Sequence, residues 1–328
     1  MSDIFNDKIK DYINSFKKIE PNLVLSIGII KNNTKAQYVF SNQNSLNDDY
    51  SYDIGSITKV YTALVISYLI SNKTLFLEDE IGKYLNLNIQ TPTIKNLLTH
   101  SAYRPVMSLK FMIKNFLKLS YFKTNPYNNK TNDDLIKYLK RHSFNKEKEY
   151  FYSDVNYAAL GNLIENVYNN DYYNVMNNFI NSQLKLSNTK FSMDSSNKIN
   201  SFHKRKLVSS FNWNKKDAFL SAGGLCSTLN DSLEFINYLM NSKEEYILNS
   251  LNPIKRILLK KYKLKIGYAW HIGENGNLYY HRGAVGCYRS IYMFNKKKNI
   301  GIVILSNCIG NQLYNVNKLG KEIYKLLK

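Results

Sequence analysis

The segment that most constrains this chain spans residues 55–69, where a glycine and a serine precede a run with almost no polar residues after Lys59. This run is long enough for about three helical turns. A helix that is apolar all round belongs in a protein core, so we expect its surroundings to hold its first turn rigidly. Ser56 stands at that first turn, directly after Gly55. The chain must therefore bury one helix completely and present a serine at its N-terminal end.

Ser56 and Lys59 are three residues apart, so they lie on the same face of the predicted helix. If burial removes the proton from Lys59, its amine can activate the Ser56 hydroxyl as a nucleophile. Unpaired backbone N–H groups at the helix start can also face a developing oxyanion. The Ser-x-x-Lys pattern alone is weak evidence for a nucleophile. The pattern also begins at Ser15, Ser120, Ser182, Ser187 and Ser201. At those positions a solvated helix face is the ordinary interpretation. Only Ser56 follows a glycine and opens an apolar helix.

The formal net charge of +20 raises the question of nucleic-acid binding. A nucleic-acid footprint is a clustered basic patch, whereas the excess charge here is nearly all lysine and is spread along the chain. No RNA-binding or DNA-binding motif is present, so we predict no nucleic-acid partner.

With 328 residues the chain can bury a large core, as one domain of two lobes or as two domains.

The three cysteines are Cys226, Cys287 and Cys308, and none of them forms a C-x-x-C pair. An odd and scattered set predicts small buried thiols rather than disulfides or a zinc site. We therefore expect no metal and no other cofactor.

Residues 1–20 predict an amphipathic helix without the apolar centre of a signal peptide, and no segment is long enough to span a membrane. We expect a cytoplasmic protein.

The basic and aromatic residues 107–123 favour a helix whose apolar stripe is packed and whose lysines are solvated. A membrane-surface helix or a lid over the substrate are the alternatives, and membrane contact is not expected.

The remaining pattern predicts an α+β fold with one antiparallel sheet built from both termini, flanked by helices, and with an inserted, mostly helical lobe. Strands are expected at 23–30, 36–40, 267–271, 278–281, 288–294 and 300–305. Helices are expected at 93–100, 133–142, 157–169, 232–241 and 312–327, and a long loop at 187–216. The sheet lobe would comprise residues 1–60 and 215–328, the helical lobe residues 61–214, and the active site would lie at their interface.

Two further stretches carry candidate functional residues. Tyr152 and Asp154 precede a predicted helix, and His281 and Gly283 stand at the end of a predicted strand. Each has an ordinary structural interpretation: Tyr152 as a core residue, Asp154 as a helix N-cap and Gly283 as a bulge residue. The three stretches in this order are much harder to explain by chance.

Together these motifs resemble the penicillin-recognising serine hydrolases. The closest resemblance is to the branch with class C β-lactamases, D-aminopeptidases, DD-carboxypeptidases and β-lactamase-fold esterases. It covers most of the chain and includes residues 93–100, 222–228 and 267–270. The resemblance implies a β-lactamase-like fold and a serine hydrolase that forms an acyl-enzyme on Ser56. The implied substrate is a small molecule or short peptide with an amide, peptide or ester bond.

Site roles also follow from the resemblance. It implies that Ser56 is the acylated nucleophile and that Lys59 and Tyr152 form the base pair. The N–H groups of Ser56 and Ala284 would form the oxyanion hole, and Asp154, His281 and Gly283 would complete the substrate site. A phenol is a poor base at its ordinary pKa, so Tyr152 would need a nearby cation, either Lys59 or a protonated His281.

Two departures from the family pattern, and the form of the third motif, bear on the substrate. Asp154 stands where the family usually has asparagine, so a carboxylate would hold Lys59 protonated and a donor to the substrate would be lost. The loop that starts at His100 is bulkier than usual, and the motif from His281 to Gly283 lacks the lysine and hydroxyl of efficient β-lactamases. We therefore favour a peptide, amide or ester over an antibiotic. An acyltransferase and a catalytically silent binding protein of the same fold are the alternatives.

Overall fold

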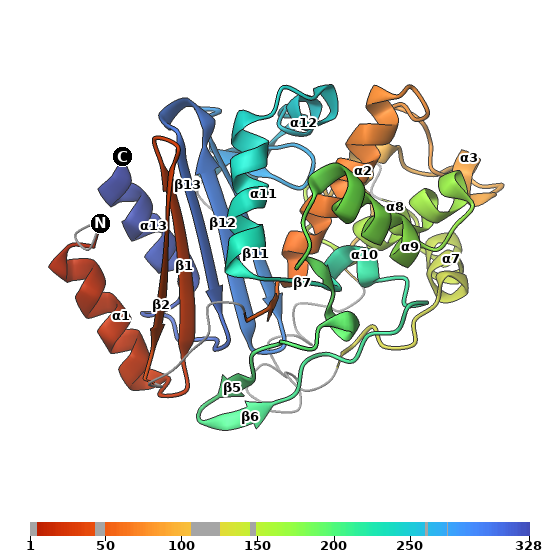
Figure 1. The fold of residues 1–328 in the computed structure, drawn as a ribbon. Helices are drawn as coiled ribbons and strands as arrows, with labels where there is room; N and C mark the ends of the chain where they lie inside the picture. The colour runs from red at the N-terminus through yellow and green to blue at the C-terminus, as the bar shows by residue number, and fades with distance from the viewer. Residues whose placement is uncertain (1–4, 43–49, 106–124, 145–148, 260–261, 274) are drawn as a thin grey trace.

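The computed structural model describes residues 5–42, 50–105, 125–144, 149–259, 262–273 and 275–328. At its centre is an eight-stranded antiparallel sheet with the order β2-β1-β13-β12-β11-β10-β9-β8 (Figure 1). The strands are β1 (Val24–Lys31), β2 (Thr34–Ser41), β8 (Lys255–Leu259), β9 (Tyr262–Ile266), β10 (His271–Gly273), β11 (Leu278–Val285), β12 (Tyr288–Asn295) and β13 (Ile300–Ser306). Because β1 pairs with β13, the predicted sheet built from both ends of the chain is confirmed.

Helices cover both faces of this sheet. Helices α1 (Asp7–Ile19) and α13 (Val316–Leu327) lie on one face, and α11 (Leu229–Asn241) lies on the other (Figure 1). Helix α1 packs through Ile9, Ile13 and Phe16, whose spacing of three and four residues places them on one side of the helix. The apolar spacing in the sequence thus accounts for the outer helical layer.

The helical part of the chain surrounds α2 (Thr58–Ser71), the predicted buried helix. Only Tyr68, Ile70 and Ser71 of this helix are partly exposed. The other helices of this part are α3 (Gly82–Leu85), α4 (Ile94–Leu98), α7 (Asn132–Arg141), α8 (Asp154–Tyr168), α9 (Tyr172–Phe179), α10 (Leu220–Gly223) and α12 (Glu245–Ser250). Helices α8, α10 and α12 pack against α2, and α10 also contacts the 3-10 turn at its start.

Several predicted element bounds were wrong. Residues 267–270 form a turn rather than a strand, because Ala269 adopts a left-handed φ of 68° and the Gly267 N–H bonds the Trp270 carbonyl. The hairpin of β8 and β9 was not predicted. Helix α13 begins at Val316 rather than at residue 312, because the Asn315 side chain caps it.

The predicted long loop at 187–216 also contains short strands: β4 (Lys190–Phe191), β5 (Ser201–His203) and β6 (Lys206–Val208). Strand β4 pairs with β7 (Leu225–Ser227), which is distant in sequence, so a local pattern could not reveal it. The three cysteines are buried and free, as predicted.

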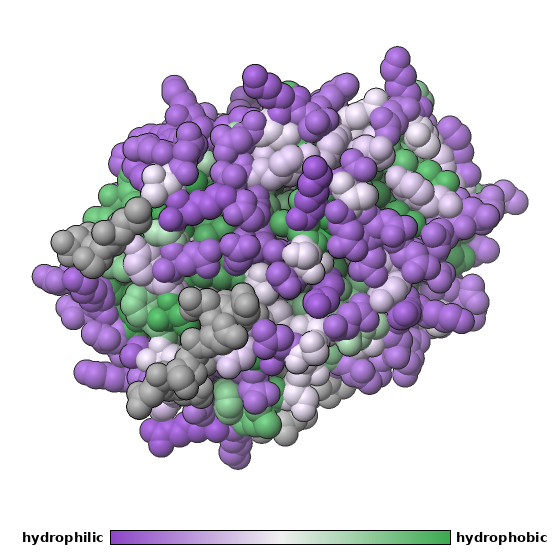
Figure 2. All heavy atoms as spheres, viewed as in Figure 1, coloured by the Kyte–Doolittle hydropathy of each residue, from purple (hydrophilic) through white to green (hydrophobic). Residues whose placement is uncertain are grey.

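The predicted helix at 107–123 lies outside the described residues, and the proposed lobe boundaries stay a prediction. Across the described ranges, no helix combines the length and apolar character needed to cross a bilayer. Hydrophilic side chains cover most of the face in Figure 2, and apolar residues appear between them in small groups.

Candidate active site

Ser56 lies in a short 3-10 turn, Gly55–Ile57, that leads directly into α2. Gly55 has a left-handed φ of 53°, and a Cβ atom at this position would stand 2.8 Å from the Ala284 backbone nitrogen. Glycine is therefore required both for the turn and for its close approach to β11. The turn presents Ser56, which is partly exposed, beside β11 and β12.

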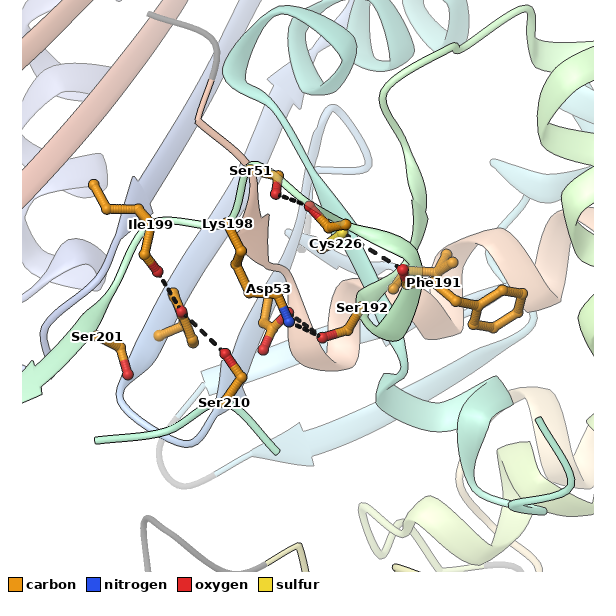
Figure 3. Close-up of polar contacts among 12 residues, drawn as sticks. Ser51, Asp53, Phe191, Ser192, Lys198, Ile199, Ser201, Ser210 and Cys226 are labelled. Atoms are coloured by element: carbon orange, nitrogen blue, oxygen red, sulfur yellow. Dashed lines mark hydrogen bonds and ion pairs between the residues drawn. The ribbon is translucent and has the colours of Figure 1, made fainter. Parts of the chain in front are cut away.

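A buried polar cluster anchors the chain just before Ser56 (Figure 3). Asp53 ends β3 (Tyr52–Asp53) and pairs with Lys198 at 3.1 Å, and the Ser192 hydroxyl donates to Asp53 Oδ1 at 2.6 Å. Burial raises the pKa of Asp53, and the charge of Lys198 opposes this rise. The Ile54 N–H also bonds the Leu225 carbonyl at 3.0 Å. No local pattern predicted this cluster, because Asp53 and Ser192 are 139 residues apart in the sequence.

Lys59 is completely buried, and its ammonium group lies close to oxygen atoms of three residues besides Tyr152. Its Nζ lies 2.9 Å from Ser56 Oγ, 2.7 Å from the Ala222 carbonyl oxygen and 2.7 Å from Asp154 Oδ1. An ammonium group has three hydrogens to donate, so this arrangement suits the protonated form. The carbonyl of Ala222 was not predicted, since a backbone acceptor leaves no signature in the residue types.

The pKa of Lys59 reflects opposed effects. Burial lowers it, but Asp154 and Tyr152 raise it by more, so the net change is upward. The hypothesis that burial removes the proton from Lys59 is therefore wrong for this resting arrangement. The expectation that Asp154 holds Lys59 protonated agrees with this direction.

Asp154 is the first residue of α8, and Ser153 is the N-cap position. Its Oδ1 faces Lys59, and its Oδ2 accepts a hydrogen bond of 2.7 Å from the Tyr127 hydroxyl. Both carboxylate oxygens are thus used for side-chain contacts, and the N-cap interpretation does not hold. No pattern in the sequence marked Tyr127 as part of the site.

Tyr152 keeps 37% of its surface exposed, which excludes the core interpretation, and its hydroxyl interacts with both Ser56 and Lys59. Loss of water around the hydroxyl raises the pKa of Tyr152, the charge of Lys59 lowers it and Asp154 raises it, with a net rise. Lys59 is also 5.2 Å from the centre of the Tyr152 ring. The positive charge of Lys59 is therefore available to stabilise a phenolate when one forms.

His281 cannot supply that charge. Its ring is 6.2 Å from the Tyr152 ring and only 1% of its surface is exposed. Burial, together with His271 and Lys59, lowers the pKa of His281 well below its usual value, so the imidazole is neutral. The hypothesis of a protonated His281 beside Tyr152 is wrong in this structure, and direct contact of its side chain with substrate stays a prediction.

Gly283 allows β11 to approach the serine turn. A Cβ atom at Gly283 would stand 1.9 Å from the Ile54 carbonyl oxygen and 2.2 Å from Ser290 Oγ. The pairing of β11 with β12 continues without interruption through Gly283, so this residue is not in a bulge. Gly283 is needed because no side chain fits between the strand and the turn.

A pocket beside Ser56, which we call the Ser56 pocket, brings together residues from all three motifs. Ser56, Asp154 and Ala284 line it, whereas Lys59 lies beneath them and His281 is outside its lining. A carbonyl carbon placed next to Ser56 could therefore direct its oxygen toward the Ala284 backbone. This geometry suits acyl transfer to a serine. The role of Ala284 as an oxyanion donor remains a prediction.

We predict that Asp154→Asn shifts the pH dependence of kcat/KM for an ester toward lower pH. The carboxylate raises the pKa values of both Lys59 and Tyr152, so its removal lets a proton leave this group at lower pH. The measurement is the pH–rate profile of acylation for the variant and the unchanged chain.

Asp133→Asn is a matched control, because Asp133 is exposed on α7 and the substitution removes the same charge away from Lys59. Its profile should match that of the unchanged chain. An identical profile for Asp154→Asn would contradict the proposed electrostatic link between Asp154 and the base pair.

We also predict that His271 makes the fold sensitive to acid. His271 Nε2 and the Tyr150 hydroxyl share a hydrogen bond of 2.9 Å, and burial, with the charge of Arg282, lowers the pKa of His271 from 6.5 to about 4. Between these pH values the unfolded chain binds a proton that the folded chain does not. The stability contributed by neutral His271 is complete above pH 6.5 and is lost as the pH falls toward 4, which amounts to about 3 kcal/mol.

Urea denaturation of the unchanged chain and of His271→Gln at several pH values would measure this effect. A glutamine oxygen can still accept a hydrogen bond from Tyr150, so the variant should lose less free energy of unfolding between pH 6.5 and 4. His142→Gln, at an exposed position, is the control. Equal losses for His271→Gln and the unchanged chain would show that His271 does not carry the effect.

Comparisons with known proteins agree with this fold and motif set. The sequence model of the Beta-lactamase family matches residues 24–318. Protein flp of Staphylococcus aureus (strain MRSA252) is 25% identical over 277 residues, which cover 78% of this chain and 52% of that protein. The chain therefore spans about half the length of the curated relatives it matches.

Solved structures with the same fold include an octameric penicillin-binding protein homologue from Pyrococcus abyssi, with a TM-score of 0.78 and 22% identity over 97% of this chain and 76% of that chain. A D-amino acid amidase from Ochrobactrum anthropi SV3 gives a TM-score of 0.74 and 16% identity, covering 98% of both chains. At these identities the likeness concerns the fold, and it confirms the predicted β-lactamase-like architecture. Because the family match spans most of the chain and includes all three motifs, the chain belongs to the beta-lactamase family of serine hydrolases.

Proposed function

We propose that this chain hydrolyses an amide, peptide or ester bond through an acyl-enzyme on Ser56. The observation that carries the proposal is the distance of 2.9 Å between Lys59 Nζ and Ser56 Oγ, with the Tyr152 hydroxyl interacting with both. A serine with a cation and a phenol in this arrangement is the pattern of an activated nucleophile. The fold shared with a D-amino acid amidase supports the inclusion of amides among the substrates.

In the acylation step, the Ser56 oxygen forms a bond with the substrate carbonyl carbon. In the reactive state, Tyr152 and Lys59 together have lost one proton. The Tyr152 oxygen can then accept the proton of the Ser56 hydroxyl. The bond to the leaving group then breaks, and the leaving group takes up that proton. The charge of Lys59 favours the required phenolate, and backbone N–H groups of Ser56 and Ala284 receive the oxyanion.

In the deacylation step, Tyr152 accepts a proton from a water molecule that attacks the ester on Ser56. The carboxylic acid leaves, and Ser56 recovers its proton from Tyr152. If an amine or alcohol replaces the water, the same step transfers the acyl group. The two activities therefore differ only in which nucleophile reaches the acyl-enzyme.

The decisive experiment combines turnover with intact-mass spectra recorded over time, using p-nitrophenyl esters, D-amino-acid amides and a penicillin. A hydrolase shows a transient adduct on Ser56 and turnover that added amines or alcohols divert little. Adduct that accumulates and discharges faster with an added amine or alcohol supports a transferase instead. No adduct with any reagent supports a binding protein.

We expect slow ester or amide turnover and little penicillin hydrolysis. The motif from His281 to Gly283 has neither the lysine nor the hydroxyl that a penicillin carboxylate would engage. Rapid penicillin turnover would overturn this expectation but would still support the acyl-enzyme on Ser56.

A further inference from the structure

Four of the residues that line the Ser56 pocket are aromatic. We call this group the aromatic wall, and it consists of Tyr127, Phe211, Trp213 and Phe219. Trp213 and Phe219 are each only 5% exposed. Tyr127 is more than 80 residues away in the sequence from the other three, so the aromatic wall exists only in the folded chain.

The rings of the aromatic wall are held in place by one another and by the site. Tyr127 and Phe219 are stacked with centroids 4.1 Å apart and an interplanar angle of 9°. The Tyr127 hydroxyl is fixed by its hydrogen bond to Asp154. Phe211 and Trp213 form a second, tilted pair with centroids 6.5 Å apart. An apolar, aromatic lining is thus prepared before any substrate arrives.

Trp213 also has an unused donor. Its buried indole N–H has no hydrogen-bond partner among the described residues, although buried donors are usually paired. The ring packs near Gly223, where a Cβ atom would stand 3.7 Å from Trp213 Cζ2, next to the residue whose carbonyl binds Lys59.

The charges around the Ser56 pocket disfavour an anionic group. Asp154 is the one charged residue among the described pocket-lining residues, and its partner Lys59 is completely buried. Arg282 is exposed on β11 and does not line the pocket. Its charge instead lowers the pKa values of Tyr150, His271 and Tyr280 relative to burial alone. A carboxylate in the pocket would meet Asp154, and no described lining residue offers it a cation.

We propose that the acyl group accepted by Ser56 carries an uncharged aromatic ring, which lies against the aromatic wall. This inference rests on the proposed acyl-enzyme function and specifies its substrate. Because Ser56 itself lines the pocket, an acyl group bonded to its oxygen stays beside the wall, whereas the leaving group departs. The ring replaces water on apolar surface and so accelerates acylation.

The test uses thioesters of N-acetylcysteamine, whose leaving group is aliphatic and neutral. The acyl groups are acetyl, phenylacetyl and succinyl, the last being anionic. The Ser56 oxygen forms an ester with the acyl carbon, the carbon–sulfur bond breaks, and the thiol leaves with the proton from Ser56. Thiol release gives kcat/KM, and intact-mass spectra report the adduct on Ser56.

We expect kcat/KM for phenylacetyl to exceed that for acetyl at least about tenfold, and succinyl to react no faster than acetyl. In Trp213→Ala and in Phe219→Ala the phenylacetyl preference should fall toward one. Trp213→Phe should keep most of it. Phe76→Ala is the matched control, because Phe76 is 57% exposed and is not a pocket residue, and its preference should be unchanged.

If Trp213→Ala does not fold, Phe211→Leu at a half-buried position tests the same wall. Equal rates for phenylacetyl and acetyl, a preference for succinyl, or a preference that survives in the wall variants would each overturn the proposal. In those cases an adduct on Ser56 would still form. Failure of the proposed function is distinct, because then no thioester would label Ser56.

Discussion

Replacing Ser56 with alanine should abolish formation of the acyl-enzyme and lower ester turnover by at least about 10³-fold. The mass adduct seen with p-nitrophenyl esters should disappear. The fold should persist, because Lys59 keeps its contacts to the Ala222 carbonyl and to Asp154. Thermal unfolding of the variant should therefore stay close to that of the unchanged chain.

Ser182→Ala is the matched control for this experiment. Ser182 has a lysine at the same spacing, Lys185, but it is exposed and donates a hydrogen bond to the Asn178 carbonyl. Its activity and adduct should be unchanged. If Ser56→Ala retained activity while a fluorophosphonate probe labelled another serine, the assignment of the nucleophile would be wrong.

Replacing Gly283 with alanine should cause the second large loss, about 100-fold or more in kcat/KM. The added Cβ would stand 1.9 Å from the Ile54 carbonyl oxygen, so β11 and the serine turn must separate. Displacement of reacting groups by about 1 Å is enough to cost a factor of this size. Overpacking should also destabilise the fold by about 1–3 kcal/mol. Acylation rates and thermal unfolding together measure both effects.

Gly273→Ala is a fair comparison within the same sheet. A Cβ atom at Gly273 would find its nearest neighbour at 3.6 Å, which is an ordinary contact. This variant should keep both activity and stability. Unchanged acylation in soluble Gly283→Ala would mean that the approach of β11 to the serine turn does not matter for the chemistry.

The main elements could be predicted because their signals are local. The apolar run after Lys59 indicated a buried helix, and the alternation and spacing of apolar residues indicated the terminal strands and α1. Strand β4 and the hairpin of β8 and β9 escaped prediction. Their short segments are stabilised by partners elsewhere in the chain rather than by a local pattern.

Ionisation in the site illustrates the same limit. The residue types suggested a Lys59 deprotonated by burial or a charged His281. Only the structure gives the distance of 2.7 Å between Lys59 and Asp154 and the complete burial of His281. Charge state depends on the balance of desolvation against nearby charges, and that balance is a property of three-dimensional placement.

The local signals of the glycine turn, the buried helix and the motif after it were enough to indicate that Ser56, Lys59 and Asp154 lie together. The charge states of these residues and the identity of their further neighbours depend on tertiary packing. Tyr127 hydrogen-bonds Asp154, and the Ala222 carbonyl accepts a hydrogen bond from Lys59. Trp213 and Phe219 line the Ser56 pocket. All of these contacts join segments that are distant in the sequence. Such contacts arise only when the chain packs, since burial and proximity are created by the fold and not by any one segment.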